Sequence, residues 1–199
     1  MPSVNEQRVL EDLYNLRKIG TYKTGVHRPT LTKDDMRARE WLKDELSKIG
    51  HDARIDGVAN VIGFSPASGP KLICGSHLET QNHAGWLDGA LGVVYALEAA
   101  RCLQETGSEF GVDVIAFSDE EGHFGELTGS NSLIGNVTED MLDNAVDRTS
   151  GKKFRDALAD AGLADAPRVT LDPNRYVGMF EAHIEQGPSL ENDNKRIGI

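Results

Sequence analysis

Two histidines and three carboxylates in this sequence have the types and the spacing expected of a metal site. Each lies at or near the end of a segment with the pattern of a β-strand. Imidazole and carboxylate groups together suit borderline divalent metals such as zinc, manganese or cobalt. One carboxylate can bridge two such ions, and an unliganded carboxylate can accept a proton from the attacking water. The residues concerned are His77, Asp88, Glu120, Glu121 and His183.

Taken singly, each of these residues also has an ordinary structural explanation. A lone histidine is more often structural, a pair of glutamates is more often solvated, and an aspartate before a glycine is commonly a turn or cap. The argument for a site rests on their conjunction at strand ends. Asp119, Glu120 and Glu121 add to it, because adjacent acids packed together without a cation raise one another's pKa.

The elements that must position these residues follow from hydrophobic patterning. The apolar runs 72–74 and 112–117 predict buried strands, with His77 and Glu120 at or just beyond their carboxyl ends. Residues 51–64 predict a hairpin, and Thr32 with Asp35 gives a helix-capping signal. Helical periodicity predicts helices over residues 4–19, 33–49, 90–103 and 153–161.

The last part of the chain carries the second histidine of the set. Residues 176–186 predict a strand in which Glu181, His183 and Glu185 share one face by the period of two. Residues 195–199 predict the start of a further strand. Together the segments predict an α/β fold, a three-layer sandwich with a mixed central sheet and helices on both faces.

Composition limits the classes of partner. The chain has 199 residues, 39% of them hydrophobic, and a net charge of -11, which argues against nucleic acid or an anionic membrane surface. The start, MPSVNEQRVL, is too polar for a signal peptide, and no apolar run approaches the roughly 20 residues of a membrane span. We therefore expect a cytoplasmic protein with a small-molecule substrate. Cys74 and Cys102 are expected to be free thiols.

Three segments resemble the signatures of the N-carbamoyl-L-amino-acid hydrolase family, which includes allantoate amidohydrolase and β-ureidopropionase. They are GSHLETQNHAGWLDGALGVVYALEAAR, FSDEEGHFGELTGS and EAHIEQGPSLE. The family belongs to the zinc aminoacylase and carboxypeptidase superfamily, and the resemblance extends along essentially the whole chain. It implies a catalytic domain like that of the zinc exopeptidases.

The resemblance also implies metal-binding and catalytic roles. His77, Asp88 and His183 would bind one metal, and Asp88 would bridge to a second metal that Glu121 also holds. Glu120 would be the general base and later the general acid. The implied reaction is hydrolysis of a carbon-nitrogen bond in a linear amide, first of all an N-carbamoyl-L-amino acid or a related ureido compound, by metal-activated water.

Two further residues have implied roles around this centre. Gln186 matches a family glutamine that contacts the amide or ureido group of the substrate. Glu79 stands where the superfamily usually has an aspartate that orients the metal-binding histidine, and its longer side chain would reach His77 from the second coordination sphere. Asn131 stands where the family commonly has an arginine.

By the same resemblance, residues 1–199 form the amino-terminal part of a catalytic domain. In the family, a lid and dimerisation domain follows the HIEQGP segment, and the chain then returns to supply a last histidine ligand. The complete site would hold two divalent ions and this chain one, and the full-length family is expected to be homodimeric. The alternatives are a catalytically silent metal-binding or interaction module, and a deacylase or dipeptidase of the same superfamily.

Overall fold

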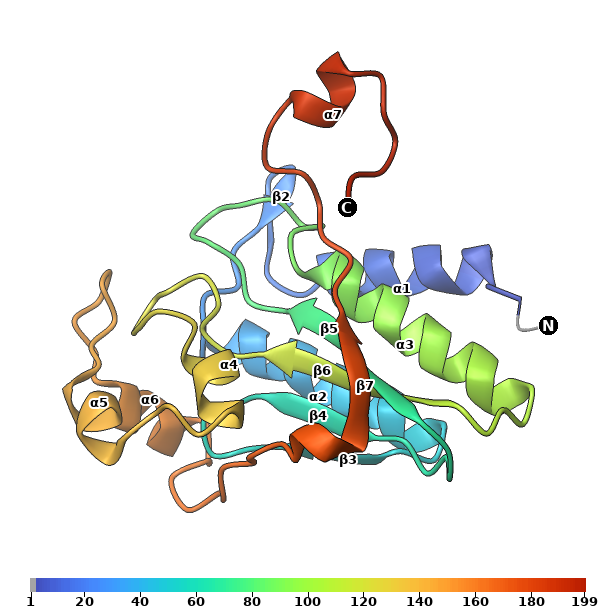
Figure 1. Ribbon diagram of the computed structural model, residues 1–199. Helices are drawn as coiled ribbons and strands as arrows, with labels where there is room; N and C mark the ends of the chain where they lie inside the picture. The colour runs from blue at the N-terminus through green and yellow to red at the C-terminus, as the bar shows by residue number, and fades with distance from the viewer. Residues whose placement is uncertain (1–2) are drawn as a thin grey trace.

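A mixed five-stranded sheet forms the centre of the computed structural model, which describes residues 3–199 (Figure 1). In spatial order its strands are β3 (Asp52–Ile55), β4 (Val61–Phe64), β6 (Gly111–Phe117), β5 (Lys71–His77) and β7 (Tyr176–Phe180). The strand β4 is antiparallel to β3 and β6, whereas β5 is parallel to β6 and β7. The carboxyl ends of the three parallel strands therefore meet at one edge, where the predicted site residues follow.

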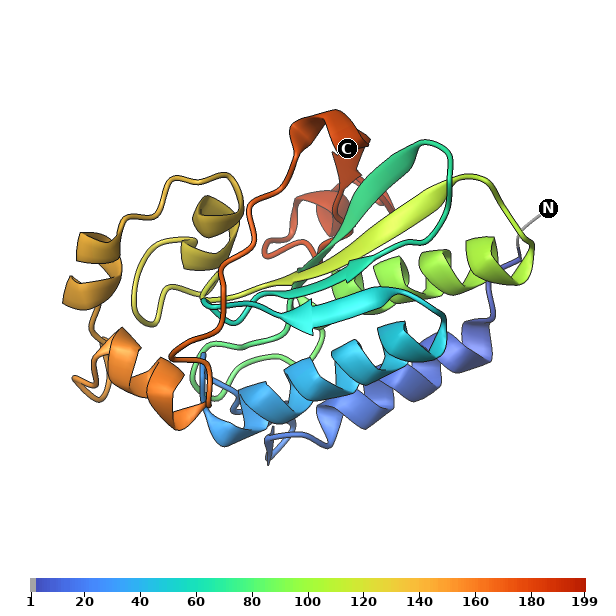
Figure 2. The same ribbon diagram turned by 90° about the horizontal axis from the view of Figure 1, so that it is seen from below.

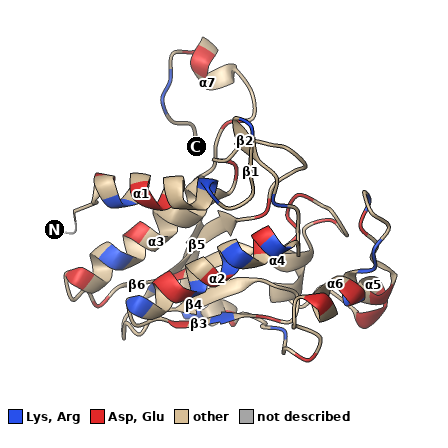
Figure 3. Cartoon of the chain, turned by 180° about the vertical axis from the view of Figure 1, so that it is seen from behind, with Lys and Arg blue, Asp and Glu red and all other residues tan. Residues whose placement is uncertain are grey.

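Three long helices cover one face of this sheet, as Figure 2 shows. They are α1 (Glu6–Arg17), α2 (Lys33–Lys48) and α3 (Ala90–Glu105), close to the predicted ranges. Their apolar sides pack with residues such as Val114 and Ala116 of β6 in one hydrophobic cluster. Charged residues lie along the outer sides of these helices (Figure 3), as expected for solvated positions. The predicted cap of α2 is confirmed, since the Thr32 side chain accepts a hydrogen bond from the Asp35 amide.

The opposite face is covered by shorter elements. Ile73 and Ile115 of the sheet pack there against Leu133 of α4 (Thr128–Leu133), together with Leu171 from the segment before the 3-10 helix η1 (Pro173–Arg175). The helices α5 (Glu139–Asn144) and α6 (Phe154–Asp160) form a separate small cluster. The predicted α/β class with helices on both faces is confirmed, although the two helical layers differ in extent.

A small hairpin braces the loop that follows β5. It consists of β1 (Thr21–Tyr22) and β2 (Gly25–Val26), and Val26 forms an isolated bridge with Ala84. The buried guanidinium of Arg28 then donates hydrogen bonds to the main-chain oxygens of Leu78, Leu16 and Ile19. Arg28 thereby connects the end of α1 to the start of the loop that follows β5.

The predicted strand over residues 176–186 is wrong beyond Phe180. Its last pair with β5 joins Phe180 to Cys74, so β7 ends before the end of its neighbour. The chain then turns, and Glu181, His183 and Glu185 do not share the face of a strand. The strand predicted over residues 195–199 is also wrong: this stretch is exposed and follows α7 (Ser189–Asn192), which stands away from the sheet (Figure 1).

Two smaller expectations can be compared with the structure. Cys74 and Cys102 are free thiols, as predicted. Within residues 3–199, every helix is too short or too polar to cross a bilayer.

Candidate metal centre

The ring of His77, the last residue of β5, is 1% exposed and has a fixed orientation. Its Nδ1 lies 2.9 Å from the main-chain oxygen of Glu79, to which it can donate a hydrogen bond. This leaves Nε2 facing two carboxylates, 3.7 Å from Oδ1 of Asp88 and 3.5 Å from Oε2 of Glu120. The backbone contact therefore directs Nε2 toward the other predicted site residues.

His183 lies close to the same carboxylate, that of Asp88. Its ring centroid lies 5.9 Å from that of His77, which agrees with the predicted proximity of the two histidines. Its Nδ1 lies 2.9 Å from the Ile184 main-chain oxygen, and its Nε2 lies 3.1 Å from Oδ1 of Asp88. Both histidines thus direct Nε2 toward one carboxylate oxygen.

Asp88 reaches this position because of the glycine that follows it. Gly89 has a φ of +65°, and a Cβ there would lie 2.5 Å from ring atoms of His77. Residue 89 must therefore lack a side chain if Asp88 and His77 are to be adjacent. Gln186 donates a hydrogen bond to Oδ2 of Asp88 at 2.8 Å, so the outer oxygen of this carboxylate is already satisfied.

Two carboxylate oxygens of the site are buried and accept no hydrogen bond within residues 3–199: Oε1 of Glu121, and Oδ1 of Asp88, which is close only to Nε2 of the two imidazoles. Unpaired buried carboxylate oxygens are costly, and a divalent cation would satisfy them. The described residues contain two groups of possible metal ligands, and within each group the donor atoms all lie within 4.8 Å of one another. One comprises His77, Asp88 and His183, and the other comprises His77, Glu120 and Glu121. The residues present therefore fit a metal, whereas the bridging role of Asp88 remains a prediction.

The electrostatics of the site favour a positive charge. Burial alone lowers the pKa of His77, but Asp88, Glu79 and Glu120 outweigh it and raise this pKa to about 9. The pKa of the Asp88 carboxyl is lowered by His77, against burial, and also by the hydrogen bond from Gln186. A cation, whether a proton or a metal ion, is stabilised at this place.

Asp119 does not belong to the site, although it directly precedes the two glutamates. It is buried, with a φ of +57°. Its carboxylate accepts hydrogen bonds from the amides of His123, Phe124 and Gly125 and from the Thr128 hydroxyl. The argument from like charges packed together therefore does not apply to Asp119, because this residue organises its own loop. The loop-forming role was missed, although aspartate commonly binds nearby amides in turns.

Glu79 has a different contact from the one expected. The carboxylate does not reach the ring of His77, because the main-chain oxygen of Glu79 already contacts Nδ1. Instead Oε1 accepts a hydrogen bond from the Glu120 amide at 2.5 Å, and Oε2 accepts one from Arg39 at 2.6 Å. The extra methylene lets the carboxylate pass the histidine and reach the next strand's loop.

Arg39 fixes the Glu79 carboxylate in this position, a role that sequence reasoning missed. Its guanidinium is fully buried and pairs with Asp35, one helical turn earlier, as well as with Glu79. It also donates hydrogen bonds to the main-chain oxygens of Ala59 and Phe117. Asp35 four residues before an arginine was the available signal, but that spacing is common on exposed helices.

A cavity of about 420 Å³ lies beside the candidate metal ligands. Glu120, with a side chain 36% exposed, and Glu121 line it, as does His183. A second, more apolar cavity of about 630 Å³ adjoins it and shares Glu120. Glu181 lines that second cavity, which places it apart from His183.

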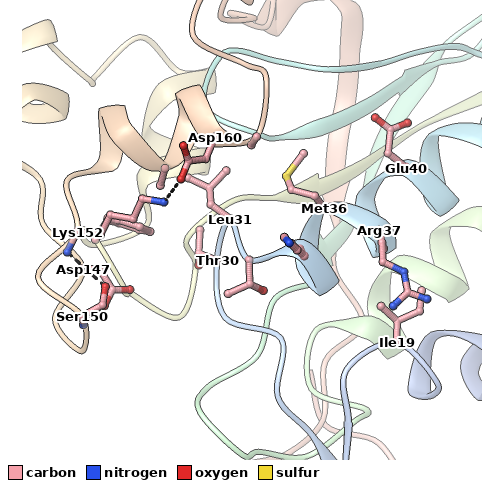
Figure 4. A pocket seen from close by; sticks show the side chains of 15 residues that line it. Ile19, Thr30, Leu31, Met36, Arg37, Glu40, Asp147, Ser150, Lys152 and Asp160 are labelled. Atoms are coloured by element: carbon pink, nitrogen blue, oxygen red, sulfur yellow. Dashed lines mark hydrogen bonds and ion pairs between the residues drawn. The ribbon is translucent and has the colours of Figure 1, made fainter.

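A larger cavity, of about 1020 Å³, lies elsewhere, between the start of α2 and α6 (Figure 4). It contains none of the predicted site residues. Two of its charged side chains, Lys152 and Asp160, pair with each other, and Arg37 pairs with Asp34. Size alone therefore does not identify the functional site of this chain.

Comparisons with known proteins agree with the resemblance seen in the sequence. The model of peptidase family M20/M25/M40 matches residues 66–199. An N-carbamoyl-L-amino-acid amidohydrolase from Pseudomonas sp. (strain NS671) is 32% identical over 99% of this chain and 50% of its own length. Allantoate deiminase 2 from Glycine max is 30% identical over 100% of this chain and 43% of its own length.

A solved structure extends the likeness to three dimensions. The crystal structure of an amidase of the hydantoinase/carbamoylase family from Burkholderia phymatum is 47% identical, with a TM-score of 0.94 over 98% of this chain and 48% of that one. The chain spans about half the length of the relatives it matches. The sequence-based resemblance and the fold class are confirmed by these matches.

Proposed function

Because the chain belongs to peptidase family M20/M25/M40, we propose that it is the amino-terminal part of a metal-dependent hydrolase acting on carbon-nitrogen bonds of linear amides. N-carbamoyl-L-amino acids, or related ureido compounds, are the substrates that the names of its relatives favour. The activity of the whole protein is part of this proposal, since residues 1–199 span about half of each relative.

One observation carries the metal dependence. Oδ1 of Asp88 and Oε1 of Glu121 are buried without a hydrogen bond within residues 3–199, and Nε2 of both His77 and His183 faces the first of them. We propose that His77, Asp88 and His183 hold one divalent ion and that Glu121 helps to hold a second. Imidazole and carboxylate donors fit zinc, and also manganese or cobalt.

The geometry suits Glu120 to proton transfer. When bound, a divalent ion supplies Lewis acidity and makes water a better nucleophile near neutral pH. The Glu120 carboxylate lines the cavity beside His77, while its amide is held by Glu79. It can therefore take a proton from the attacking water and return it to the leaving nitrogen. Gln186 lines the same cavity, where we expect it to contact the amide or ureido group.

The deciding experiment compares the two neighbouring glutamates. We expect Glu120→Gln to retain metal and to lower turnover of an N-carbamoyl-L-amino acid by about 10²- to 10⁴-fold. Glu121→Gln should lose the second ion, which Glu121 helps to hold, as well as turnover, and should keep the ion held by His77, Asp88 and His183. Elemental analysis after dialysis against zinc or manganese, together with a substrate assay, measures both. Equal metal loss in the two variants would contradict the roles assigned to them.

A second candidate function is a catalytically silent metal-binding or interaction module. The exposure of Val177, Met179 and Phe180 along β7 favours it, since such a strand can associate with other chains. Metal retained without turnover of any substrate would support this candidate. A substrate panel that includes N-acyl amino acids and dipeptides separates the carbamoyl hydrolase from a deacylase or dipeptidase of the same superfamily.

A further inference from the structure

The loop after β5 holds the loop after β6 through alternate residues. Glu79 accepts a hydrogen bond from the Glu120 amide at 2.5 Å. Two residues later, Nε2 of Gln81 donates to Oε2 of Glu121 at 2.6 Å and to its main-chain oxygen at 3.1 Å. Neighbouring residues of one loop are thus held by different chemical groups of the other. Glu120 is held through its main-chain amide, and Glu121 through its main-chain oxygen and its carboxylate.

The orientation of the Gln81 amide is itself fixed. Its Oε1 accepts a hydrogen bond from the guanidinium of Arg148 at 2.5 Å. Because a guanidinium has no acceptor, the carbonyl side of the amide must face Arg148, and the NH₂ side must face Glu121. The Arg148 amide in turn donates to the main-chain oxygen of His123 at 2.8 Å, which ties this contact to the same loop as Glu121.

These contacts leave the two glutamates with unlike carboxylates. Glu121 has one oxygen paired with Gln81 and the other, Oε1, buried without a hydrogen bond in residues 3–199. The Glu120 side chain is 36% exposed, and its carboxylate extends into the cavity. An amide can fix the Glu121 carboxylate without adding a charge that would compete for a cation.

We propose that Gln81 is the positioning residue that presents Oε1 of Glu121 to a metal ion, so that Glu121 acts as ligand and Glu120 stays free. The inference rests on the proposed metal site. Without the amide at position 81, the Glu121 side chain can rotate toward solvent. Ordering it again would then reduce the net free energy of metal binding. Support of this kind from outside the ligand shell typically changes metal affinity by about 10- to 100-fold.

The test uses zinc affinity at the second ion's position, which Glu121 helps to form, measured by competition with a chromogenic chelator. We expect Gln81→Leu to weaken binding by about 10- to 100-fold. Asn82→Leu is the matched control, because Asn82 is exposed on the same loop and contacts Thr149 instead of Glu121. We expect its affinity to stay within about twofold of the unchanged chain, the size of effect usual for a surface substitution.

A double-mutant cycle separates positioning from general damage to the site. If Gln81 acts through Glu121, Gln81→Leu should have little further effect on zinc affinity in a Glu121→Gln background. An equal loss in both backgrounds would overturn the proposal. So would an unchanged affinity in Gln81→Leu alone.

A second readout needs neither metal nor substrate. In the metal-free chain, the side-chain amide of Gln81 should exchange slowly with solvent by NMR. Exchange should become faster in Glu121→Leu, whose side chain has no acceptor, and stay unchanged in Asn82→Leu. Fast exchange in the unchanged chain would overturn the positioning role. Failure of the proposed hydrolase function appears instead as absent turnover by the zinc-loaded chain, which neither readout involves.

Discussion

The two histidines of the candidate site come from regions of very different burial. The His77 side chain is 1% exposed, whereas that of His183 is 33% exposed. His77 ends a central strand that is paired on both sides. His183 belongs to the C-terminal arm, which we define as residues 181–199 and which extends past the edge strand β7 (Figure 1).

The difference lies in what holds each histidine in place. Next to His77, the guanidinium of Arg39 donates hydrogen bonds that join α2 to the loop before β4, to β6 and, through the Glu79 carboxylate, to the loop after β5. The C-terminal arm reaches the site through His183 and through Gln186, both at Asp88. We therefore expect the buried side to keep its arrangement without metal, and metal binding to order the arm.

The largest effect should come from removing the support beside His77. Arg39→Met would leave the buried carboxylates of Asp35 and Glu79 without their guanidinium partner, so we expect a loss of about 3 to 5 kcal/mol in the free energy of unfolding. Arg37→Met is the control on the same helix, because Arg37 is exposed and pairs with Asp34 at the surface. It should cost about 0 to 1 kcal/mol in the same urea titration. Equal losses would contradict the supporting role of Arg39 beside His77.

Gly89→Ala should disturb the site itself. A Cβ would lie 2.5 Å from the His77 ring, and the positive φ adds about 1 to 3 kcal/mol of backbone strain. We expect zinc affinity to fall by at least about 100-fold, a change of roughly 2.7 kcal/mol. Gly85→Ala is the matched control, since a Cβ there would have no atom within 4 Å. Normal zinc binding by Gly89→Ala would show that His77 is less constrained than its burial indicates.

The pH dependence of metal binding should be smaller and of defined sign. The pKa of His77 is raised from 6.5 to about 9, so the ring is protonated at neutral pH in the metal-free chain. Zinc must displace this proton, and affinity should rise about tenfold per pH unit up to about pH 9. The raised pKa also means that His77 stabilises the metal-free fold fully below pH 6.5 and loses this contribution through about pH 9. If zinc affinity did not change between pH 7 and 8, this would contradict a buried histidine surrounded by acids.

The same contrast explains what sequence could and could not predict. The strands before His77 and Glu120, and the cap of α2 at Thr32, are local patterns, and the structure agrees with them. The contact of Arg39 with Glu79 joins residues forty positions apart, so no local pattern contains it. The reach of Glu79 past His77 likewise depends on where two loops meet.

The prediction of a strand in the C-terminal arm was wrong for the opposite reason. Its alternation of Glu181, His183 and Glu185 fits a strand, but a strand also needs a partner, and β7 pairs with β5 no further than Phe180. Local pattern without a neighbouring edge was therefore misleading. The site residues themselves were brought together as predicted, because those on β5 and β6 follow strands whose order places their ends side by side.

The last comparison concerns stability without metal and with zinc, and it tests the two histidines directly. His77→Ala would leave buried carboxylate oxygens without their cationic neighbour, so we expect a loss of about 1 to 3 kcal/mol in the free energy of unfolding. His183→Ala removes a half-exposed ring from the C-terminal arm, and its effect should stay within about 0.5 kcal/mol.

Without metal, His183→Ala and the unchanged chain should have similar stability, but adding zinc should separate them. At a zinc concentration 100 times its Kd, the unchanged chain should gain about 2.7 kcal/mol, because zinc binds the folded state. His183→Ala should gain much less, since one ligand of three is missing from the group with His77 and Asp88. Thermal unfolding with and without zinc measures both quantities. A full gain in His183→Ala would mean that the buried side binds zinc without the arm.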